Sequence, residues 1–334
     1  MSCLYITEQG SKITVSEGKV VVECKDGLKR MVPQETLESI MIFGNVLMTI
    51  PAQKLCLENG IKVTYLSTKG KYFGRLESTA HFNAKRLKAQ VYLSDNDGDC
   101  LEFAVKVQKA KVHNQRIILK RYEKNSDKDI REELKRIEIY ENKISQCECI
   151  DEVMGYEGMA AKEYFRALSK IVREEFAFNG RSRQPPLDAF NSMLSFAYTI
   201  IFYEIYAELQ NRDLSPYIGF IHKIKQNHPA LVSDMIEEWR AVLADATILS
   251  LVQGREISKE EFTTDEETGA VQLSDNAIKI CVRKLEEKMR KNINYLEYLD
   301  APTSFRRAIW WQVKTLAACV DEEDFTNYKP LRIK

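Results

Sequence analysis

The sequence lacks long apolar runs and an excess of charge of either sign. No stretch approaches the roughly 18 uncharged apolar residues of a membrane-spanning helix, and the first segment, MSCLYITEQGSK, has no basic stretch leading into an apolar core. Lysine and arginine together number 49, and so do aspartate and glutamate, so any site for a polyanion must be a local patch. We therefore expect a cytoplasmic protein without a membrane partner.

Cysteine pairs of the kind that bind zinc are also missing. The eight cysteines are scattered, and Cys147 and Cys149 form a C-x-C pair without the second pair that would complete a zinc site. We expect reduced thiols. The chain has 334 residues, and single cores rarely grow much beyond roughly 250 residues, so two domains are expected.

The first part of the chain has the short alternating pattern of β-strands. From residue 3 to about 77, apolar and β-branched residues alternate with polar ones, and the pattern breaks at Gly10, Gly18 and Gly27. One helix is expected to begin at Pro51 and to end at the pair Asn59-Gly60, before the strands IKVTYLS and KYFGRLE. We predict a β-rich domain of sandwich-like hairpins at 1–78 and a linker at 79–90.

The remainder, 91–334, has mainly helical spacing. In LEFAVKVQKAKVHNQRIILKRY, Leu101, Val105, Val112 and Ile118 recur on one apolar side of a predicted helix. The exception is REISKEEFTTDEETGAVQLS, which predicts a hairpin with its turn at residues 266–269. The predicted fold class is therefore α+β, a β-rich N-terminal domain followed by a larger all-α domain.

The stretch GFIHKIKQNHPALVSDMIEEWR combines two histidines with three acids. A helix that begins near Pro229 would carry its apolar residues on one side and Asp234, Glu237 and Glu238 on the other. Two interpretations are open: a metal site, or the ordinary polar face of a helix whose dipole favours acids near its start. His222 lies in an apolar lead-in and would sit over the acids or in the core, whereas His228 is expected in a solvent-facing turn.

A second acid stands between glycines in MGYEGMAAKEYFRAL. We place Glu157, between Gly155 and Gly158, at the start of a helix, where glycines would let backbone and substrate come close. The alternative is a flexible helix start with a dipole-favoured glutamate.

A third motif, NGRSRQPPLDAFNSMLSFAYTIIFYE, contains two arginines in a proline-rich segment. Asp188 is a predicted N-cap, and Arg181 and Arg183 would then project from an ordered loop. Fixed guanidinium groups are suited to bidentate phosphate contacts, although a surface loop with arginines is also a sufficient explanation.

Together these stretches resemble the CRISPR-associated integrase/endonuclease family of the adaptation step, in which spacers are captured. The family patterns EG..A..YF, R.R.PP.D..N..LSF.Y, GF.H and L..D..EE.R occur here in that order. The resemblance extends to IPAQKLCLENGIKVTYLSTKGKYFGRL with NAKRLKAQ near the front and NYKPLR at the end. Two departures exist: KIKQNHP replaces a common glycine-arginine pair, and Ala241 stands where the family often has proline.

The resemblance implies that Glu157, His222 and Glu237 are the catalytic residues and hold a divalent metal, with Asp234 beside them. Two carboxylates and an imidazole without a thiolate suit Mg²⁺ or Mn²⁺ better than zinc. The implied reaction is strand transfer, in which a 3′-hydroxyl of protospacer DNA attacks the CRISPR repeat without a protein nucleophile. Arg183 and Lys225 are candidates for steadying phosphates.

The resemblance also implies partners: double-stranded DNA, a small CRISPR adaptation protein, and a homodimer formed through the β-rich domains, with two dimers in the full complex. Local basic residues would position DNA, although a solvated helix face explains them as well. These candidates are Lys85, Arg86, Lys106, Lys109, Arg116 and Lys120. Two other functions stay open: a metal-dependent nuclease that hydrolyses branched DNA or RNA with water, and a non-catalytic DNA-binding scaffold.

Overall fold

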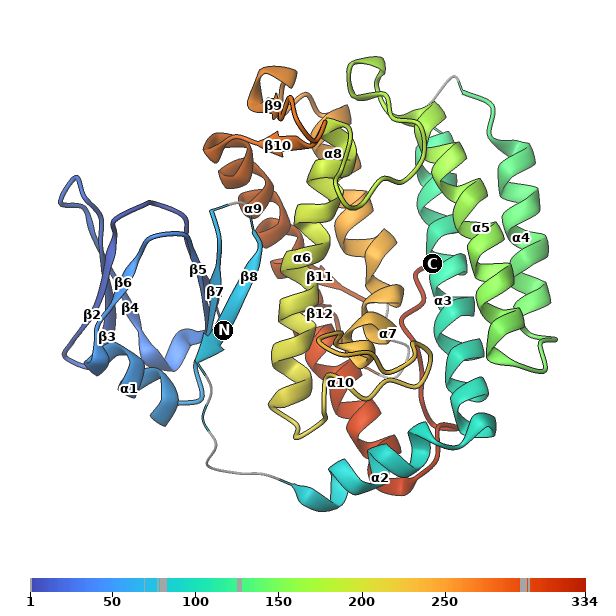
Figure 1. Cartoon of the computed structure of the whole chain (residues 1–334), viewed down its shortest axis with the longest axis horizontal. Helices are drawn as coiled ribbons and strands as arrows, with labels where there is room; N and C mark the ends of the chain where they lie inside the picture. Colours follow the sequence, from blue (N-terminus) through green and yellow to red (C-terminus); the bar gives the residue numbers. More distant parts are fainter. Residues whose placement is uncertain are drawn as a thin grey trace. The chain divides into compact units, whose positions relative to one another are not determined.

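The computed structural model describes residues 2–68, 70–76, 78, 83–124, 128–294, 299 and 301–334. The chain divides into two units, Met1–Phe82 with Leu273–Val282, and Asn83–Gln272 with Arg283–Lys334 (Figure 1). The first is rich in strands and the second is mainly helical, as the sequence predicts. The inclusion of Leu273–Val282 in the first unit was not predicted.

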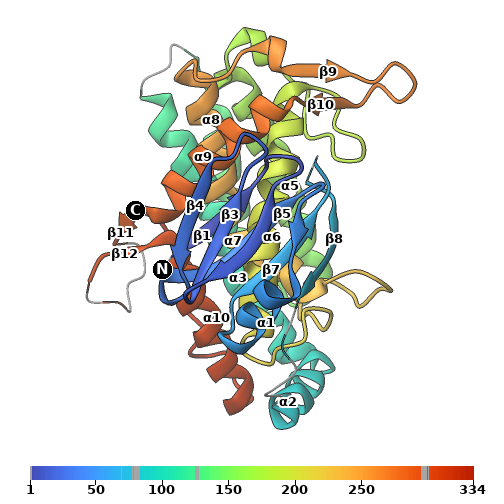
Figure 2. The ribbon, with the colours of Figure 1, turned by 90° about the vertical axis from the view of Figure 1, so that its left-hand side faces the viewer.

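The first unit contains two four-stranded sheets, in the orders β1-β5-β7-β8 and β4-β3-β2-β6 (Figure 2). Its elements are β1 (Ser2–Ile6), β2 (Lys12–Ser16), β3 (Lys19–Glu23), β4 (Lys29–Pro33), β5 (Leu37–Phe43), β6 (Leu47–Met48), α1 (Ile50–Glu58), β7 (Lys62–Leu66) and β8 (Tyr72–Leu76). Buried residues from both sheets and from α1 share one core, among them Ile13, Val20, Ile40, Val63 and Ala52. The predicted sandwich is confirmed.

The predicted run of hairpins is only partly correct. Strands β2, β3 and β4 do form an antiparallel meander, and Gly18 and Gly27 take the positive φ values of 72° and 83° that its turns require. However, β5 pairs in parallel with both β1 and β7. A parallel pair needs a crossover, which α1 provides between β5 and β7, and the central strand is buried along nearly its whole length instead of alternating.

The predicted linker is wrong in its second half. Residues 79–82 lie outside the described residues, but α2 (Ala84–Ser94) begins directly after them. The side chain of Asn83 caps this helix by accepting a hydrogen bond from the backbone N–H of Arg86. The helical unit therefore starts several residues earlier than predicted.

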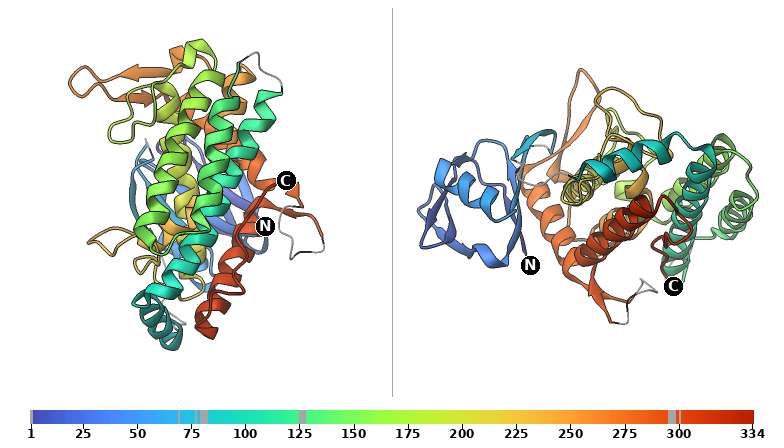
Figure 3. Two further views of the ribbon diagram at one scale, coloured as in Figure 1. Left: turned by 90° about the vertical axis from the view of Figure 1, so that its right-hand side faces the viewer. Right: turned by 90° about the horizontal axis from the view of Figure 1, so that it is seen from below.

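The second unit is built around long helices. They are α3 (Asp97–Glu123), α4 (Arg131–Ile144), α5 (Ile150–Ile171), α6 (Ala189–Gln210), α7 (Ala230–Trp239), a π-helical turn (Arg240–Asp245), α8 (Ala246–Gln253), α9 (Asp275–Arg290), which begins in the first unit's segment, and α10 (Phe305–Glu322). Helices α3, α4 and α5 pack against one another (Figure 3). A short pair, β11 (Asn292–Ile293) with β12 (Thr303–Ser304), was not predicted. Within the described residues, no helix is long and apolar enough to cross a membrane.

The predicted hairpin near residue 266 is confirmed as β9 (Phe262–Thr264) and β10 (Val271–Leu273), with Gly269 in its turn at φ 68°. The hairpin also holds the arginine-containing loop. The backbone N–H of Val271 donates to the carbonyl of Pro186, and Ser192 Oγ donates to the carbonyl of Val271. The loop and the first turn of α6 are therefore both bound to Val271 of the hairpin.

Helix α7 lacks the polar face that the sequence predicts. All its residues are buried, including Asp234 and Glu238, which are fully covered, and Glu237, which is 5% exposed. Helices α3 and α6 pack against it, and buried carboxylates need partners because desolvation of an unpaired charge is costly. Each acid has its own partners, so the interpretation as a solvated helix face is wrong.

Candidate metal centre

The centre brings together α3, α5 and α7. Glu157 belongs to α5, which begins at Ile150, so the glutamate and its flanking glycines lie inside the helix and not at its start as predicted. Added Cβ atoms at Gly155 and Gly158 would meet nothing within 4 Å. Open space thus lies along the helix beside Glu157, and the role of the glycines in admitting a substrate stays a prediction.

A lysine that the sequence did not single out joins the two predicted carboxylate ligands. Nζ of Lys111, on α3, lies 2.5 Å from Oε1 of Glu157 and 2.5 Å from Oε2 of Glu237. All three side chains are largely buried. Burial opposes the charge on Lys111, but Glu237 and Glu157 outweigh it and raise the pKa of the ammonium. Carboxylates from α5 and α7 therefore face one shared cation.

Glu237 has a second cation close by. Nε of Arg240 lies 3.3 Å from Oε2 of Glu237, and its guanidinium lies 4.8 Å from the ring centroid of Tyr198. Burial tends to raise the pKa of Glu237, but Arg240 and Lys111 lower it to about 2. Glu237 is thus an anion throughout the physiological pH range, as a metal ligand must be.

His222 is held by Asp234. Oδ1 of Asp234 lies 2.6 Å from Nδ1 of His222 and accepts the backbone N–H of the same residue at 2.9 Å. Burial lowers the pKa of His222, but the hydrogen bond and the charge of Asp234 more than offset this, and the pKa is raised from 6.5. With Nδ1 fixed in this way, the ring keeps Nε2 for another contact, which is the usual arrangement of a metal-ligating histidine.

The loop before α7 depends on a glycine. The backbone N–H groups of Phe220 and Ile221 donate to Oδ2 of Asp234 at 2.7 and 3.1 Å. A Cβ on Gly219 would lie 2.7 Å from that same oxygen and 2.9 Å from backbone and side-chain carbons of Ala230. The motif GF.H therefore describes a backbone that passes directly over a buried carboxylate, and this passage points His222 into the site.

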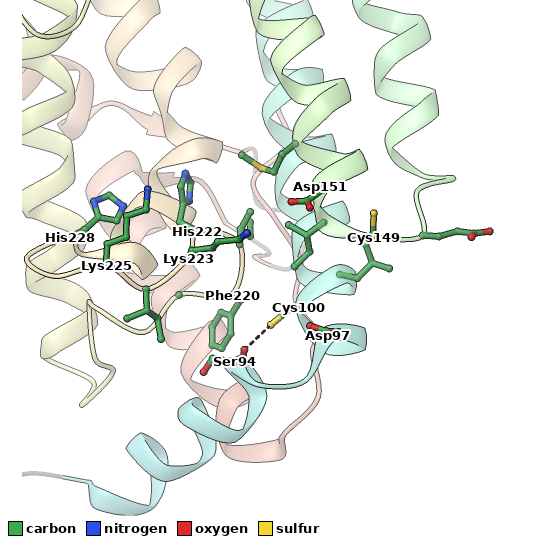
Figure 4. A pocket seen from close by; sticks show the side chains of 17 residues that line it. Ser94, Asp97, Cys100, Cys149, Asp151, Phe220, His222, Lys223, Lys225 and His228 are labelled. Atoms are coloured by element: carbon green, nitrogen blue, oxygen red, sulfur yellow. Dashed lines mark hydrogen bonds between the residues drawn. The ribbon is translucent and has the colours of Figure 1, made fainter.

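A pocket of about 730 Å³ opens beside His222 (Figure 4). The loop 219–228 forms one wall, and the starts of α3 and α5 form the other. Lys225 and His228 lie on the loop side, and Cys149 and Asp151 lie on the helix side. Lys225 is exposed, as a residue that steadies a phosphate must be, and the partly exposed His228 closes a turn whose other residues are exposed, as predicted.

Two of the predicted ligands, Glu157 and Glu237, share one cation, but with His222 they do not form a closed cluster. Within the described part of the chain, the group of three potential ligand atoms that all lie within 4.8 Å of one another is Glu8, Cys24 and Asp26, in the first unit. At the predicted centre, the ammonium of Lys111 stands between the carboxylates of Glu157 and Glu237. The donor set nevertheless fits a divalent ion, since two hard carboxylate ligands face a place that already holds a cation, and Asp234 orients the imidazole that would be the third ligand.

The two arginines of the loop before α6 have different environments. Asp188 caps α6 as predicted, by accepting the backbone N–H of Asn191. Arg181 does not project outward, because its guanidinium donates to Asn191 Oδ1 and Ser195 Oγ, both at 2.9 Å. Arg183 is exposed. The expectation of a projecting guanidinium is therefore met by Arg183 and wrong for Arg181.

A buried carboxylate behind this loop was not predicted. Oδ2 and Oδ1 of Asp245, in the π-helical turn, accept the hydroxyl hydrogens of Tyr164 at 2.8 Å and Tyr198 at 2.5 Å. The guanidinium of Arg181 lies 5.3 Å from the ring centroid of Tyr198, which Arg240 also approaches. Contacts thus run without interruption from the arginine loop, through Tyr198 and Arg240, to the carboxylate of Glu237.

Glu238, next to Glu237 in the sequence, binds the C-terminal segment of the chain. It accepts the hydroxyl of Tyr328 at 2.5 Å and the backbone N–H of Leu331 at 2.6 Å. Burial raises its pKa to about 8 against these hydrogen bonds. Asn114 binds the same segment through the carbonyl of Leu331 and the N–H of Ile333. The motif NYKPLR is therefore a structural anchor.

Most of the predicted DNA-positioning cations are engaged within the fold. Arg86 binds Asp321, Lys106 binds the carbonyls of Phe325 and Thr326, Lys109 binds Ser145, and Arg116 binds Glu138 and Glu141. Lys85 and Lys120 are exposed. Contacts within the fold are therefore sufficient to explain the other four basic side chains.

Comparison with known proteins identifies the family. A family model described as CRISPR associated protein Cas1 matches residues 4–287. The chain belongs to the Cas1 family. The CRISPR-associated endonuclease Cas1 of Mycobacterium tuberculosis is 31% identical over 318 residues, which make up 95% of this chain and 94% of that protein. A Cas1 endonuclease of Thermus thermophilus is 30% identical over 333 residues, covering 99% of this chain and 97% of that protein.

Solved structures share the Cas1 fold. A casposase bound to integration product has a TM-score of 0.85 at 20% identity and covers 100% of this chain and 96% of its own. A Cas6-RT-Cas1–Cas2 complex has a TM-score of 0.82 at 23% identity, covering 100% of this chain and 36% of that chain. At such identities the likeness shows the fold alone, and the sequence relatives carry the family assignment.

Proposed function

We propose that the protein is a metal-dependent DNA integrase/endonuclease of CRISPR adaptation. It joins 3′-hydroxyl ends of protospacer DNA to the CRISPR repeat by phosphoryl transfer. The observation that carries this proposal is the convergence of Glu157 and Glu237, from α5 and α7, on one buried cation, next to a histidine oriented by Asp234. The curated relatives' name, CRISPR-associated endonuclease Cas1, supports the same class of chemistry.

Glu157, Glu237 and Nε2 of His222 would hold Mg²⁺ or Mn²⁺. When bound, the ion supplies Lewis-acid polarisation of the scissile phosphodiester and neutralises charge in the transition state. Asp234 keeps the imidazole ring in one orientation. The exposed side chains of Arg183 and Lys225 contact phosphates and keep the substrate strand in place. The attacking oxygen comes from the DNA, so the protein needs no nucleophile of its own.

The partners follow from the reaction. Integration of two ends requires two active sites at a set distance, which a homodimer paired with a second dimer provides. The name of the Cas6-RT-Cas1–Cas2 complex joins a Cas1 protein to Cas2, which supports a small adaptation protein as the bridge. The DNA itself is double-stranded protospacer and repeat. A structure similar in fold is a casposase bound to integration product, which supports joining over simple cleavage.

The test uses duplex DNA with 3′-hydroxyl or dideoxy ends and a repeat-bearing plasmid. The hydroxyl ends should yield covalently joined products in Mg²⁺ or Mn²⁺, and the dideoxy ends none. Glu157→Gln should abolish joining, whereas Glu238→Gln, a buried acid outside the centre, should retain it. Joining by dideoxy ends would rule out 3′-hydroxyl attack. Cleavage without joining would favour the branched-substrate nuclease, and DNA binding without turnover would favour the scaffold.

A further inference from the structure

Lys111 occupies the place between the two acidic residues of the centre. Its Nζ has short contacts to Glu157 and to Glu237, and within the described part of the chain it has no other polar partner. A lysine ammonium is a compact charge on a flexible stem, so it can leave such a place by rotating its side chain. Arg240 is less free, because its planar group lies over the ring of Tyr198 as well as near Glu237.

Two cations already balance the charges of Glu157 and Glu237 without a metal. Glu157 and Glu237 carry one negative charge each, and Lys111 and Arg240 carry one positive charge each. A divalent ion added to this buried group would leave an excess of two positive charges, which is costly where water cannot screen it. Binding of the ion therefore requires either that one of the two cations moves away or that a phosphate group binds with it.

We propose that Lys111 is a resident counter-ion that holds Glu157 and Glu237 together without metal and is displaced when the divalent ion binds. This inference rests on the proposed function, because it concerns the same centre. Lys111 acts through the two carboxylates and is in that sense a positioning residue. Its presence keeps the metal-free protein stable and weakens metal binding in the absence of DNA, so that the centre fills mainly when phosphate supplies the missing negative charge.

The test compares Lys111→Met with wild type. Methionine keeps the length and apolar stem of the side chain but removes the charge. Lys109→Met is the matched control, since Lys109 lies on the same helix and, among the residues that the structure describes, donates to the neutral hydroxyl of Ser145. Two quantities are measured without DNA: the melting temperature with and without saturating Mn²⁺, and the Mn²⁺ dissociation constant by calorimetry or electron paramagnetic resonance.

Without metal, Lys111→Met should melt roughly 5 °C or more below wild type, because the largely buried Glu157 loses its cation and the buried Glu237 keeps one of its two, Arg240. Saturating Mn²⁺ should recover at least half of that loss, and the variant should bind Mn²⁺ about tenfold more tightly than wild type, because no ammonium competes. Lys109→Met should match wild type in both measurements. A purely structural lysine would give the same loss of melting temperature with and without Mn²⁺.

An unchanged or weaker Mn²⁺ affinity in Lys111→Met would overturn the inference while leaving the metal centre intact. Absence of Mn²⁺ binding in both wild type and variant would instead overturn the proposed function. If the variant does not fold, wild-type crystals with Mn²⁺ on Glu157 and Glu237 decide the matter. Nζ of Lys111 should then have left both carboxylates, and an ammonium still in contact with both would refute displacement.

Discussion

Substitution of Asp234 by asparagine tests how the histidine of the centre is held. The fully buried carboxylate accepts three backbone N–H groups and Nδ1 of His222. An asparagine has one oxygen, so its amide nitrogen must face either the N–H groups of Phe220 and Ile221 or the histidine. A buried donor without an acceptor costs about 1–3 kcal/mol, so two of them destabilise the loop by roughly 2–6 kcal/mol.

The loss of stability should be confined to the loop, so the assay is amide hydrogen exchange of the segment 216–226. Exchange in Asp234→Asn should accelerate by roughly 30-fold or more, while α3 stays protected. Mn²⁺ affinity should fall by roughly 10–100-fold, the usual effect of removing a residue that orients a metal-ligating histidine. Asp151→Asn, an exposed acid in the wall of the same pocket, is the control. Unchanged exchange and affinity in Asp234→Asn would show that the Asp234 carboxylate holds neither the loop nor His222.

Asp234→Asn should also change how the stability of the protein depends on pH. Because the folded pKa of His222 is raised above 6.5, its protonation stabilises the folded state fully below pH 6.5, and this contribution is lost as the pH rises through the folded pKa. Asp234→Asn should lower the pKa of His222, measured by NMR, and remove this pH-dependent part of the stability. A raised pKa that persists in the variant would assign the shift to another group.

Further outcomes follow from neighbouring residues. Gly219→Ala should destabilise the loop before α7 by about 1–3 kcal/mol, because its Cβ would lie 2.7 Å from Asp234 Oδ2; unaltered denaturation and metal affinity would contradict this contact. Arg183→Ala should keep Mn²⁺ binding and weaken DNA affinity, whereas Arg181→Ala should lower thermal stability; the reverse pattern would overturn the division between exposed and structural arginine. For Glu238, whose folded pKa is about 8, stability should decline as the pH rises from about 4.5 to 8, and Glu238→Gln should flatten that decline in denaturation curves.

The sequence predicts the elements of the fold better than their pairing. The alternation broken by glycines locates β2, β3 and β4, and Pro51 with Asn59-Gly60 delimits α1. The parallel pairing of β5 with β1 and β7 depends on contacts between distant segments, which local periodicity does not encode. The acids of α7 mislead for the same reason. They follow helical spacing like a solvated face, yet each finds a buried partner on another element.

Family-matching motifs place the predicted carboxylates and histidine in one region, but they do not reveal the cations among them. Lys111 lies in a helix with many lysines, and only its register distinguishes it: it stands four residues after buried Val107 and seven before buried Ile118. A charge within the apolar stripe of a helix was the available signal. The sequence gives no comparable signal for Tyr164 and Asp245, because their hydrogen bond joins α5 to the π-helical turn, which lies far along the chain.

Anomalous scattering from a crystal that contains Mn²⁺ would locate the divalent ion directly. We expect one peak within coordination distance of carboxylate oxygens of Glu157 and Glu237 and of Nε2 of His222, and its disappearance in Glu237→Gln. A peak only at Glu8, Cys24 and Asp26, the group in the first unit with ligand atoms already close together, would contradict the assignment.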